Sequence, residues 1–120
     1  TVAAWLDTET AVTLTAIRTR SARHHADEQV AATLFLGGEP TPVGDPLVST
    51  TYDADGRQRH VGLELWVAPD GGVPFRAAGE VLCGTTLDLG RLSLDAAFFA
   101  WRGEGRSGIG RYDILRRSDG

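Results

Sequence analysis

The feature that most constrains the fold of this chain is an alternation of apolar and polar residues, repeated in short runs that end at turn residues. Successive side chains of a β-strand point to opposite faces of a sheet, so a period of two predicts strands with one buried face. About eight such runs fill most of the 120 residues. They cover residues 2–6, 11–20, 30–36, 47–52, 59–67, 75–83, 87–101 and 107–116. The alternation therefore predicts an all-β fold.

Turn signals separate these runs. Tight turns are predicted at residues 53–56, 69–72 and 103–105. In the first of them Gly56 accepts the positive φ that a hairpin turn requires. Gly90 is expected to mark a bulge or bend inside the seventh run. The Gly- and Pro-rich stretch 37–46 is expected to exclude regular structure, and residues 21–28 are expected to form a loop.

The number of strands limits how the sheet can be arranged. An open sheet exposes two edges, whereas pairing of the first and last strands removes them. We therefore expect an antiparallel up-and-down β-barrel of the lipocalin type with about eight strands, whose interior is wide enough for one small ligand. The alternative is a two-sheet β-sandwich in which residues 37–46 form the crossing connection. Either fold fits a single domain over residues 1–120.

Composition excludes several classes of function. Hydrophobic residues make up 42% of the chain and charged residues 23%, which is ordinary for a soluble globular protein. A net charge of −4 argues against nucleic acid as a partner. No apolar stretch approaches the roughly 20 residues needed to cross a bilayer, so no membrane span is expected. The single cysteine, Cys83, cannot form an internal disulfide, and we expect a cytoplasmic location.

Metal and nucleophile chemistry find little support in the sequence. His24 and His25 are adjacent, so on a strand they would point to opposite faces and could not chelate one ion together. Asp53 and Asp55 imitate the opening of a calcium loop, but the later ligands are missing. Cys83 lies in an apolar run and is interpreted as a small packed residue. We expect neither a metal nor a cofactor.

Carboxylates and aromatic rings are the remaining candidates for a site. Four acidic residues lie inside strand patterns beside large apolar residues, namely Glu64, Glu80, Asp95 and Asp113. In an apolar cavity a carboxyl group stays protonated and can act as a general acid, whereas on the solvent face it would balance arginines across strands. Flat rings from different strands can gather around an apolar ligand. These rings belong to Trp5, Trp66, Trp101 and Tyr112.

The order of several short motifs resembles a known family. The motifs are Trp5 with the strand that follows it, the turn at 53–57, the pair Gly79 and Glu80, and the ending at 105–113. Together they make residues 2–116 similar to the C-terminal lipocalin-like domain of two-domain bacterial proteins related to AttH and to carotenoid 1,2-hydratase (hydroxyneurosporene synthase). The chain departs from this pattern at Asp113, where relatives usually have Glu, and it lacks the His-containing segment that precedes their first strand.

The resemblance implies two lipocalin-like domains packed together, an apolar terpenoid or polyketide-like ligand, and acid-assisted hydration or cyclisation in characterised relatives. The chain enters a strand pattern directly at Thr1, so we expect it to be one domain of a longer two-domain protein that binds a hydrophobic small molecule in the barrel cavity. The expected ligand-binding residues are Trp5, Glu64, Trp66, Trp101 and Tyr112, and the catalytic candidates are Glu80 and Asp113. A stand-alone hydratase or cyclase and a purely structural domain are the alternatives.

Overall fold

The computed structural model describes residues 1–18, 28–67 and 74–117, and within these ranges the chain is built from β-strands without a helix. The strands are β1 (Val2–Trp5), β2 (Ala11–Arg18), β3 (Glu28–Leu36), β4 (Glu39–Pro42), β5 (Leu47–Tyr52), β6 (Gln58–Leu65), β7 (Phe75–Asp88), β8 (Leu92–Gly103) and β9 (Arg106–Arg117). The all-β class expected from the alternation is confirmed.

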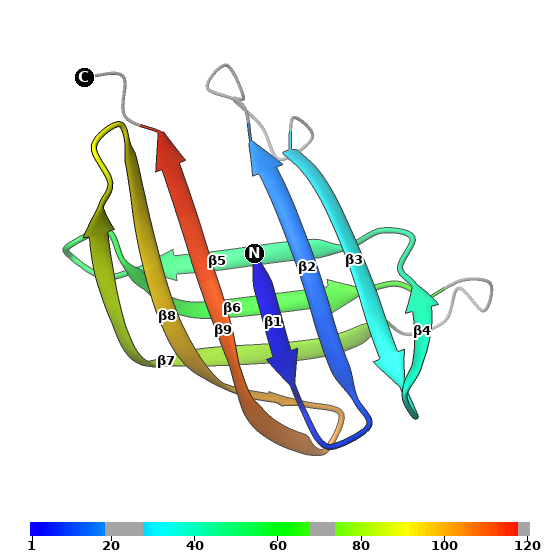
Figure 1. Ribbon diagram of the computed structural model, residues 1–120. Helices are drawn as coiled ribbons and strands as arrows, with labels where there is room; N and C mark the ends of the chain where they lie inside the picture. The colour runs from blue at the N-terminus through cyan, green and yellow to red at the C-terminus, as the bar shows by residue number, and fades with distance from the viewer. Residues whose placement is uncertain (19–27, 68–73, 118–120) are drawn as a thin grey trace.

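All nine strands belong to one antiparallel sheet with the order β4-β3-β2-β1-β9-β8-β7-β6-β5 (Figure 1). Strands that follow each other in the chain are neighbours in the sheet, with the exception of β4 and β5, which form its two free edges. The first strand, β1, pairs with the last, β9. The expected up-and-down order and the expected pairing of the first and last strands are therefore confirmed, but this pairing does not remove the edges of the sheet, because β4 and β5 have only one neighbour each. The sheet curls into a half-barrel that stays open between β4 and β5.

The curl of the sheet creates two layers. In Figure 1, β5, β6 and the start of β7 pass behind β9, β1 and β2 and cross them at a steep angle. The long strands β7 and β8 belong to both layers, and their register shifts between Val81 and Cys83. Such a bulge increases local twist and bends a strand. One continuous sheet can thus face itself, as the barrel prediction requires.

The core lies between the two layers and is formed by one face of each strand. In β6 the inward residues Val61, Leu63 and Leu65 are buried, as the alternation in residues 59–67 predicts. They pack in one cluster with Phe99 and Trp101 from β8 and with apolar side chains of β1, β2 and β3. Burial of each such large side chain contributes roughly 1.5–3 kcal/mol to folding. These side chains occupy the space between the layers.

Close approach of β1 to β9 depends on two glycines of β9. A Cβ atom at Gly110 would overlap the backbone of Ala3 and Ala4, and one at Gly108 would overlap the backbone of Trp5. Both glycines therefore leave the room that the pairing of β1 with β9 needs. The sequence Gly-Ile-Gly in the last strand is a packing feature of this joint.

Two of the expected turns are confirmed. At residues 53–56 the backbone N–H of Gly56 donates to the carbonyl of Asp53, and Gly56 has a φ of 80°. At residues 103–105 Gly105 has a φ of 76°. The expected turn at 69–72 and almost all of the expected loop at 21–28 lie outside the described residues.

Two expected irregularities were wrong. Residues 39–42, inside the Gly- and Pro-rich stretch, form β4, which pairs with β3. Prolines are tolerated there because β4 is an edge strand with only one neighbour. Gly90 does not bend a strand but sits in the hairpin turn between β7 and β8, with a φ of 82°. Leu87 consequently belongs to the end of β7.

Candidate functional site

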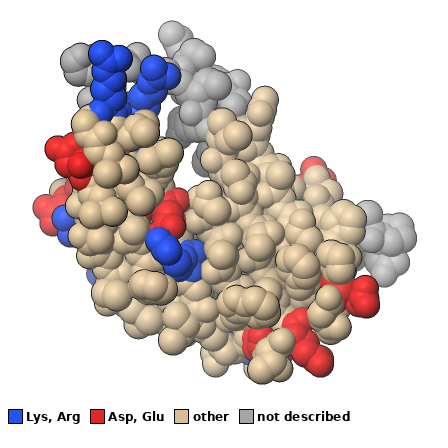
Figure 2. Space-filling model, in the orientation of Figure 1, with Lys and Arg blue, Asp and Glu red and all other residues tan. Residues whose placement is uncertain are grey.

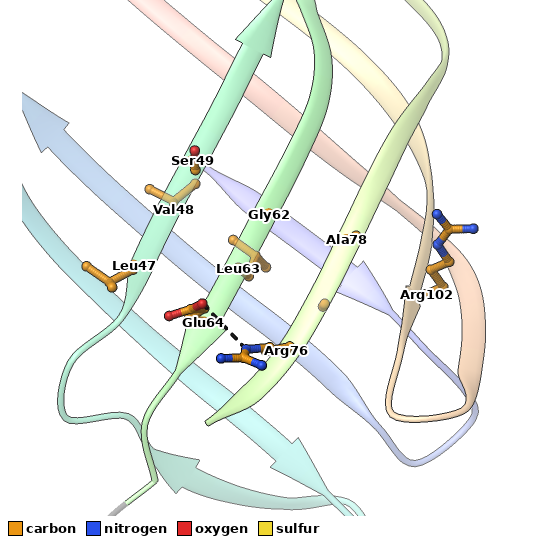
Figure 3. A pocket seen from close by; sticks show the side chains of 10 residues that line it. Leu47, Val48, Ser49, Gly62, Leu63, Glu64, Arg76, Ala78 and Arg102 are labelled. Atoms are coloured by element: carbon orange, nitrogen blue, oxygen red, sulfur yellow. Dashed lines mark ion pairs between the residues drawn. The ribbon is translucent and has the colours of Figure 1, made fainter. Parts of the chain in front are cut away.

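A groove with a volume of about 660 Å³ lies on the outer face of β5, β6 and β7 (Figure 3). Its lining follows the cross-strand register, with one row formed by Leu47, Glu64 and Arg76. The next row on the same face contains Ser49, Gly62 and Ala78. These residues alternate with the buried core residues of the same strands, so they face away from the core. The groove is therefore separated from the core by the sheet itself.

Small residues form the floor of the groove. Gly62 has no side chain, and a Cβ atom built there would meet no other heavy atom within 4 Å. Ala78 on the neighbouring strand adds only a methyl group to the same row. Leu47 of β5 supplies apolar surface beside them. The hollow thus arises where side chains are short between longer neighbours.

Charged side chains form the rim of the groove. Arg76 Nε lies 3.4 Å from Glu64 Oε1, and both side chains are in contact with solvent. A surface ion pair of this kind contributes at most about 1 kcal/mol, but it leaves the two charges neutralised. Arg102 of β8 also lines the groove, and no carboxylate in the described part of the chain lies within ion-pair distance of it. The groove therefore combines an uncharged floor with one remaining positive charge.

Glu80, one of the two predicted catalytic residues, lies one row beyond the groove floor. Its Oε1 atom is 3.7 Å from Nε2 of His60, and Nδ1 of His60 is 3.5 Å from the hydroxyl of Thr51. The carboxylate side chain is 74% exposed. Glu80 is near the groove but outside its lining.

Asp113, the other predicted catalytic residue, lies on β9 in the opposite layer. Its Oδ2 atom is 2.9 Å from Nη2 of Arg111, and its Oδ1 atom accepts a hydrogen bond from the backbone N–H of Ala97. The structure does not bring Asp113 together with Glu80, and neither residue lines the groove.

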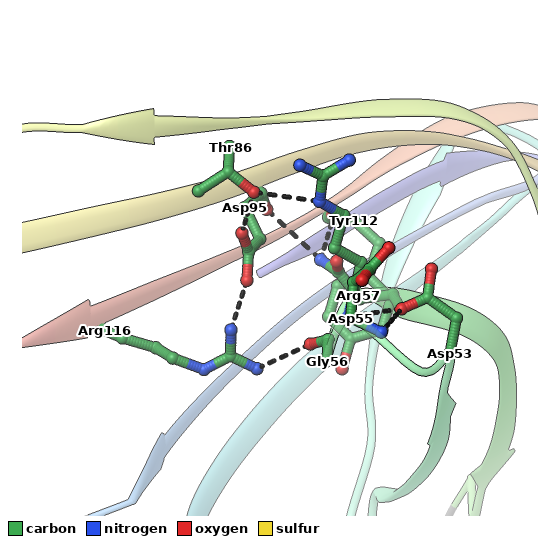
Figure 4. Close-up of polar contacts among 9 residues, drawn as sticks. Asp53, Asp55, Gly56, Arg57, Thr86, Asp95, Tyr112 and Arg116 are labelled. Carbon is green, nitrogen blue, oxygen red and sulfur yellow. Dashed lines mark hydrogen bonds and ion pairs between the residues drawn. The ribbon is translucent and has the colours of Figure 1, made fainter.

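Asp95, which the sequence also identified as a possible inward carboxylate, is buried at the other end of the half-barrel (Figure 4). It forms an ion pair with Arg116 and accepts a hydrogen bond of 2.6 Å from the hydroxyl of Thr86. The buried side chain of Gln58 donates to the backbone carbonyls of Asp95 and Tyr112. These contacts connect β6 to β8 and β9, so the cluster holds the two layers together.

The four aromatic residues expected around a ligand occupy different surroundings. Trp5 is exposed on β1, and Trp66 is half-buried beyond the end of β6. Trp101 and Tyr112 are core residues that both contact Phe99, with ring centroids 5.8 and 5.6 Å from its ring. None of the four lines the groove. Of the predicted ligand-binding residues, Glu64 alone is part of its lining.

Sequence reasoning missed most of the groove lining. Leu47, Ser49, Gly62 and Ala78 carry no chemical signature of a site, since they are small or aliphatic. The available signal was weak: Gly62 interrupts the outward face of a strand whose other face is strongly apolar. Such a gap indicates a hollow only once the neighbouring strands and their register are known.

Comparison with known proteins gives no match to a family profile, to a curated protein or to a solved structure. Among the residues that the structure describes, no group of three or more His, Cys, Asp or Glu side chains could hold a metal ion. The same part of the chain contains no helix with the length and apolarity that crossing a bilayer demands.

Proposed function

We propose that this protein binds a hydrophobic small molecule and that the groove on β5, β6 and β7 receives it. The observation that carries this proposal is a hollow of about 660 Å³ with an uncharged floor. Sites for drug-sized ligands typically have volumes of about 300–1,000 Å³ and mostly apolar linings. A terpenoid or polyketide-like molecule, the ligand class that the family resemblance implies, has a suitable size and polarity.

The rim suggests how such a ligand is oriented. Because Glu64 and Arg76 neutralise each other, they offer little attraction to a free charge. Arg102 provides a cation at the side of the groove formed by β8. A ligand with an apolar body and a polar or acidic end would use both parts of the groove. This orientation favours an amphipathic molecule over a pure hydrocarbon.

The outer groove is better supported than the barrel interior expected from the sequence. Large side chains such as Phe99, Trp101 and Leu63 pack against each other between the layers. A ligand there would have to displace them, which costs packing energy. A ligand in the outer groove would displace only water.

Membership in a two-domain hydratase- or cyclase-like protein remains part of the proposal and is supported by the motif resemblance alone. A cytoplasmic location is likewise proposed from the single cysteine. If the protein is also a hydratase or cyclase, Glu80 is the better placed of the two candidates because its strand β7 contributes to the groove. The variant Glu80→Gln would then lose turnover but keep binding, since an amide cannot donate the proton.

Fluorescence titration with Nile red tests the binding site. The variant Gly62→Leu fills the groove without a clash, because the space above Gly62 is open. We expect saturable binding to the unmodified protein, competition by farnesol, and a loss of affinity of roughly tenfold or more in Gly62→Leu. Thr15→Leu introduces the same side chain on β2, outside the groove lining, and should bind as the unmodified protein does.

The titration has two results that would contradict the proposal. Absence of saturable Nile red binding would overturn the assigned function. Equal affinities for the unmodified protein and Gly62→Leu would instead show that the groove is not the binding site. Far-UV circular dichroism of each variant establishes that it is folded, so that a loss of binding can be assigned to the groove.

A further inference from the structure

A second surface, on the opposite side of the molecule from the groove, is unusually apolar for a protein exposed to water. It is the outer face of β8, β9 and β1 with the end of β7, and we call it the outer apolar face. Its large apolar residues are 46–60% exposed and comprise Trp5, Leu87, Phe98, Ile109 and Leu115. Figure 2 views the molecule from this side and shows a broad uncharged surface that has one small charged group near its middle and further charged side chains around its edge.

The extent of this face is comparable to a small protein interface. Outward residues of β2 and β3, such as Thr13 and Thr33, continue it without adding charge. Strands lie about 4.8 Å apart and rise about 3.3 Å per residue, so five strands over about eight residues cover about 600 Å². Two such faces in contact would bury about 1,200 Å², the lower limit for a specific protein interface. A largely uncharged surface of this size lies at the upper end of what a monomer exposes, and such patches often bind a partner.

The charges in the middle of this face belong to Arg111 and Asp113 of β9. Their side chains pair with each other at 2.9 Å, and the guanidinium of Arg111 also lies 5.6 Å from the ring centroid of Phe98. The outer apolar face therefore carries one charge of each sign at its centre, although the whole chain has a net charge of −4. An acidic or basic partner would find no matching excess of charge there. A surface with the same balance of charge would be complementary to it.

The outward residues of β9 form a pattern that is complementary to itself. Ile109 and Leu115 lie three residues on either side of Tyr112, and Arg111 and Asp113 lie one residue on either side. A two-fold axis in the plane of the interface, perpendicular to β9 at Tyr112, would run two copies of β9 antiparallel. Arg111 of one copy would then face Asp113 of the other. Ile109 would face Leu115.

We propose that the outer apolar face is a homodimer interface and that its occupant is a second copy of this chain. The apolar residues supply the attraction, and the two Arg111–Asp113 contacts between copies fix the antiparallel orientation. This inference is independent of the proposed ligand binding, because the groove lies on β5, β6 and β7 in the other layer.

Sedimentation equilibrium over roughly 5–200 µM protein, a range that detects dissociation constants in the micromolar range, tests the proposal. We expect a reversible dimer of the 12.8 kDa chain. Arg111→Asp places like charges opposite each other and should weaken association roughly tenfold or more, as should Asp113→Arg. The double variant Arg111→Asp, Asp113→Arg exchanges the charges and should restore dimerisation. General stickiness of an apolar surface would not produce this reciprocal rescue.

A matched pair of leucine variants locates the interface. Leu115→Gln lies on the outer apolar face and should reduce dimerisation, whereas Leu47→Gln is similarly exposed on β5 and should leave it unchanged. Thermal unfolding monitors the folding of both variants. A monomer at all concentrations would overturn the proposal, as would a dimer that tolerates Leu115→Gln and both charge reversals. Binding of a monomer to phosphatidylcholine vesicles would identify a membrane, rather than a second copy, as the occupant.

Discussion

The hydroxyl oxygens of Thr50 and Tyr112 lie 2.6 Å apart and form a hydrogen bond between β5 and β9. The two residues are separated by 62 positions in the sequence and belong to opposite layers of the half-barrel. Because β5 is a free edge of the sheet, backbone pairing attaches it on one side only. The Thr50–Tyr112 contact therefore attaches this edge a second time. It connects β5 through the core to β9, the last strand, which pairs with β1.

Removal of this hydrogen bond should weaken the contact between the layers. We expect Tyr112→Phe to lower the free energy of unfolding by about 1 kcal/mol, because Thr50 loses its partner while the aromatic ring stays in place. Urea denaturation followed by circular dichroism measures the change. The control Tyr52→Phe removes a hydroxyl from an exposed tyrosine and should have a smaller effect. Equal losses in the two variants would argue against a special role for this contact.

The ion pair between the buried Asp95 and the half-exposed Arg116 should respond differently to loss of each partner. Arg116→Ala leaves the carboxylate of Asp95 buried without its cation, so we expect a loss of about 3 kcal/mol. Asp95→Asn leaves Arg116 half-exposed to water and retains an oxygen that can accept from Thr86, so we expect only about 1–2 kcal/mol.

Chemical denaturation of both variants measures this difference. Arg117→Ala is the control, because Arg117 is exposed at the end of β9 and should tolerate the change. A larger loss in Asp95→Asn than in Arg116→Ala would contradict burial of the carboxylate as the dominant cost.

The turn between β1 and β2 predicts a dependence of stability on pH. The backbone N–H of Glu9 donates to the carboxylate of Asp7 and, as the largest cause, lowers the pKa of Asp7 below its ordinary value of 3.8, with a smaller contribution from Arg106. The folded state thus favours the ionised carboxylate. Its stabilising contribution is fully present above the ordinary value and is lost as the pH falls through the lowered pKa of the folded state.

Thermal unfolding between pH 6 and pH 2 should reveal this contribution. We expect Asp7→Asn to be less stable than the unmodified protein at pH 6 and the two midpoints to converge at the acid end, because an amide does not titrate. Arg106→Ala should reduce the pH dependence without abolishing it, since the hydrogen bond from Glu9 remains. A constant difference between Asp7→Asn and the unmodified protein at every pH would contradict the assignment.

Much of the fold could be predicted because the alternation of apolar and polar residues along a strand indicates which of its faces is buried. Val61, Leu63 and Leu65 alternate in the sequence and point into the core in the structure. The exceptions are informative. Pro40 and Pro42 lack a backbone N–H and therefore argue against a strand when the sequence is considered alone. They fit β4 because this edge strand forms backbone hydrogen bonds on one side only. The edge position of β4 is a property of the whole sheet.

The candidate site was much less predictable. Trp101 and Tyr112 are large and aromatic, and these properties suit a ligand cavity and a packed core equally well. Glu64 could be identified as a possible site residue from its apolar neighbours, whereas Gly62 and Ala78 could not, because a hollow is defined by the side chains that surround it. The residues that surround Gly62 on its two sides come from β5, β7 and β8.

Alternation of residue types by itself determined that this chain forms strands and which face of most strands enters the core, and the turn residues determined where two of its hairpins turn. These properties depend on neighbours a few positions apart along the backbone. The interpretation of Cys83 as a packed residue was wrong, because the register shifts between Val81 and Cys83 and the cysteine is exposed. Only the tertiary structure decided that the sheet remains open between β4 and β5, that the groove lies outside the core and that a charge pair sits within an apolar face. Those features depend on the register and curvature that relate distant strands. A shift of register by two residues keeps the same apolar face inward, so the alternation in the sequence cannot distinguish one such register from another.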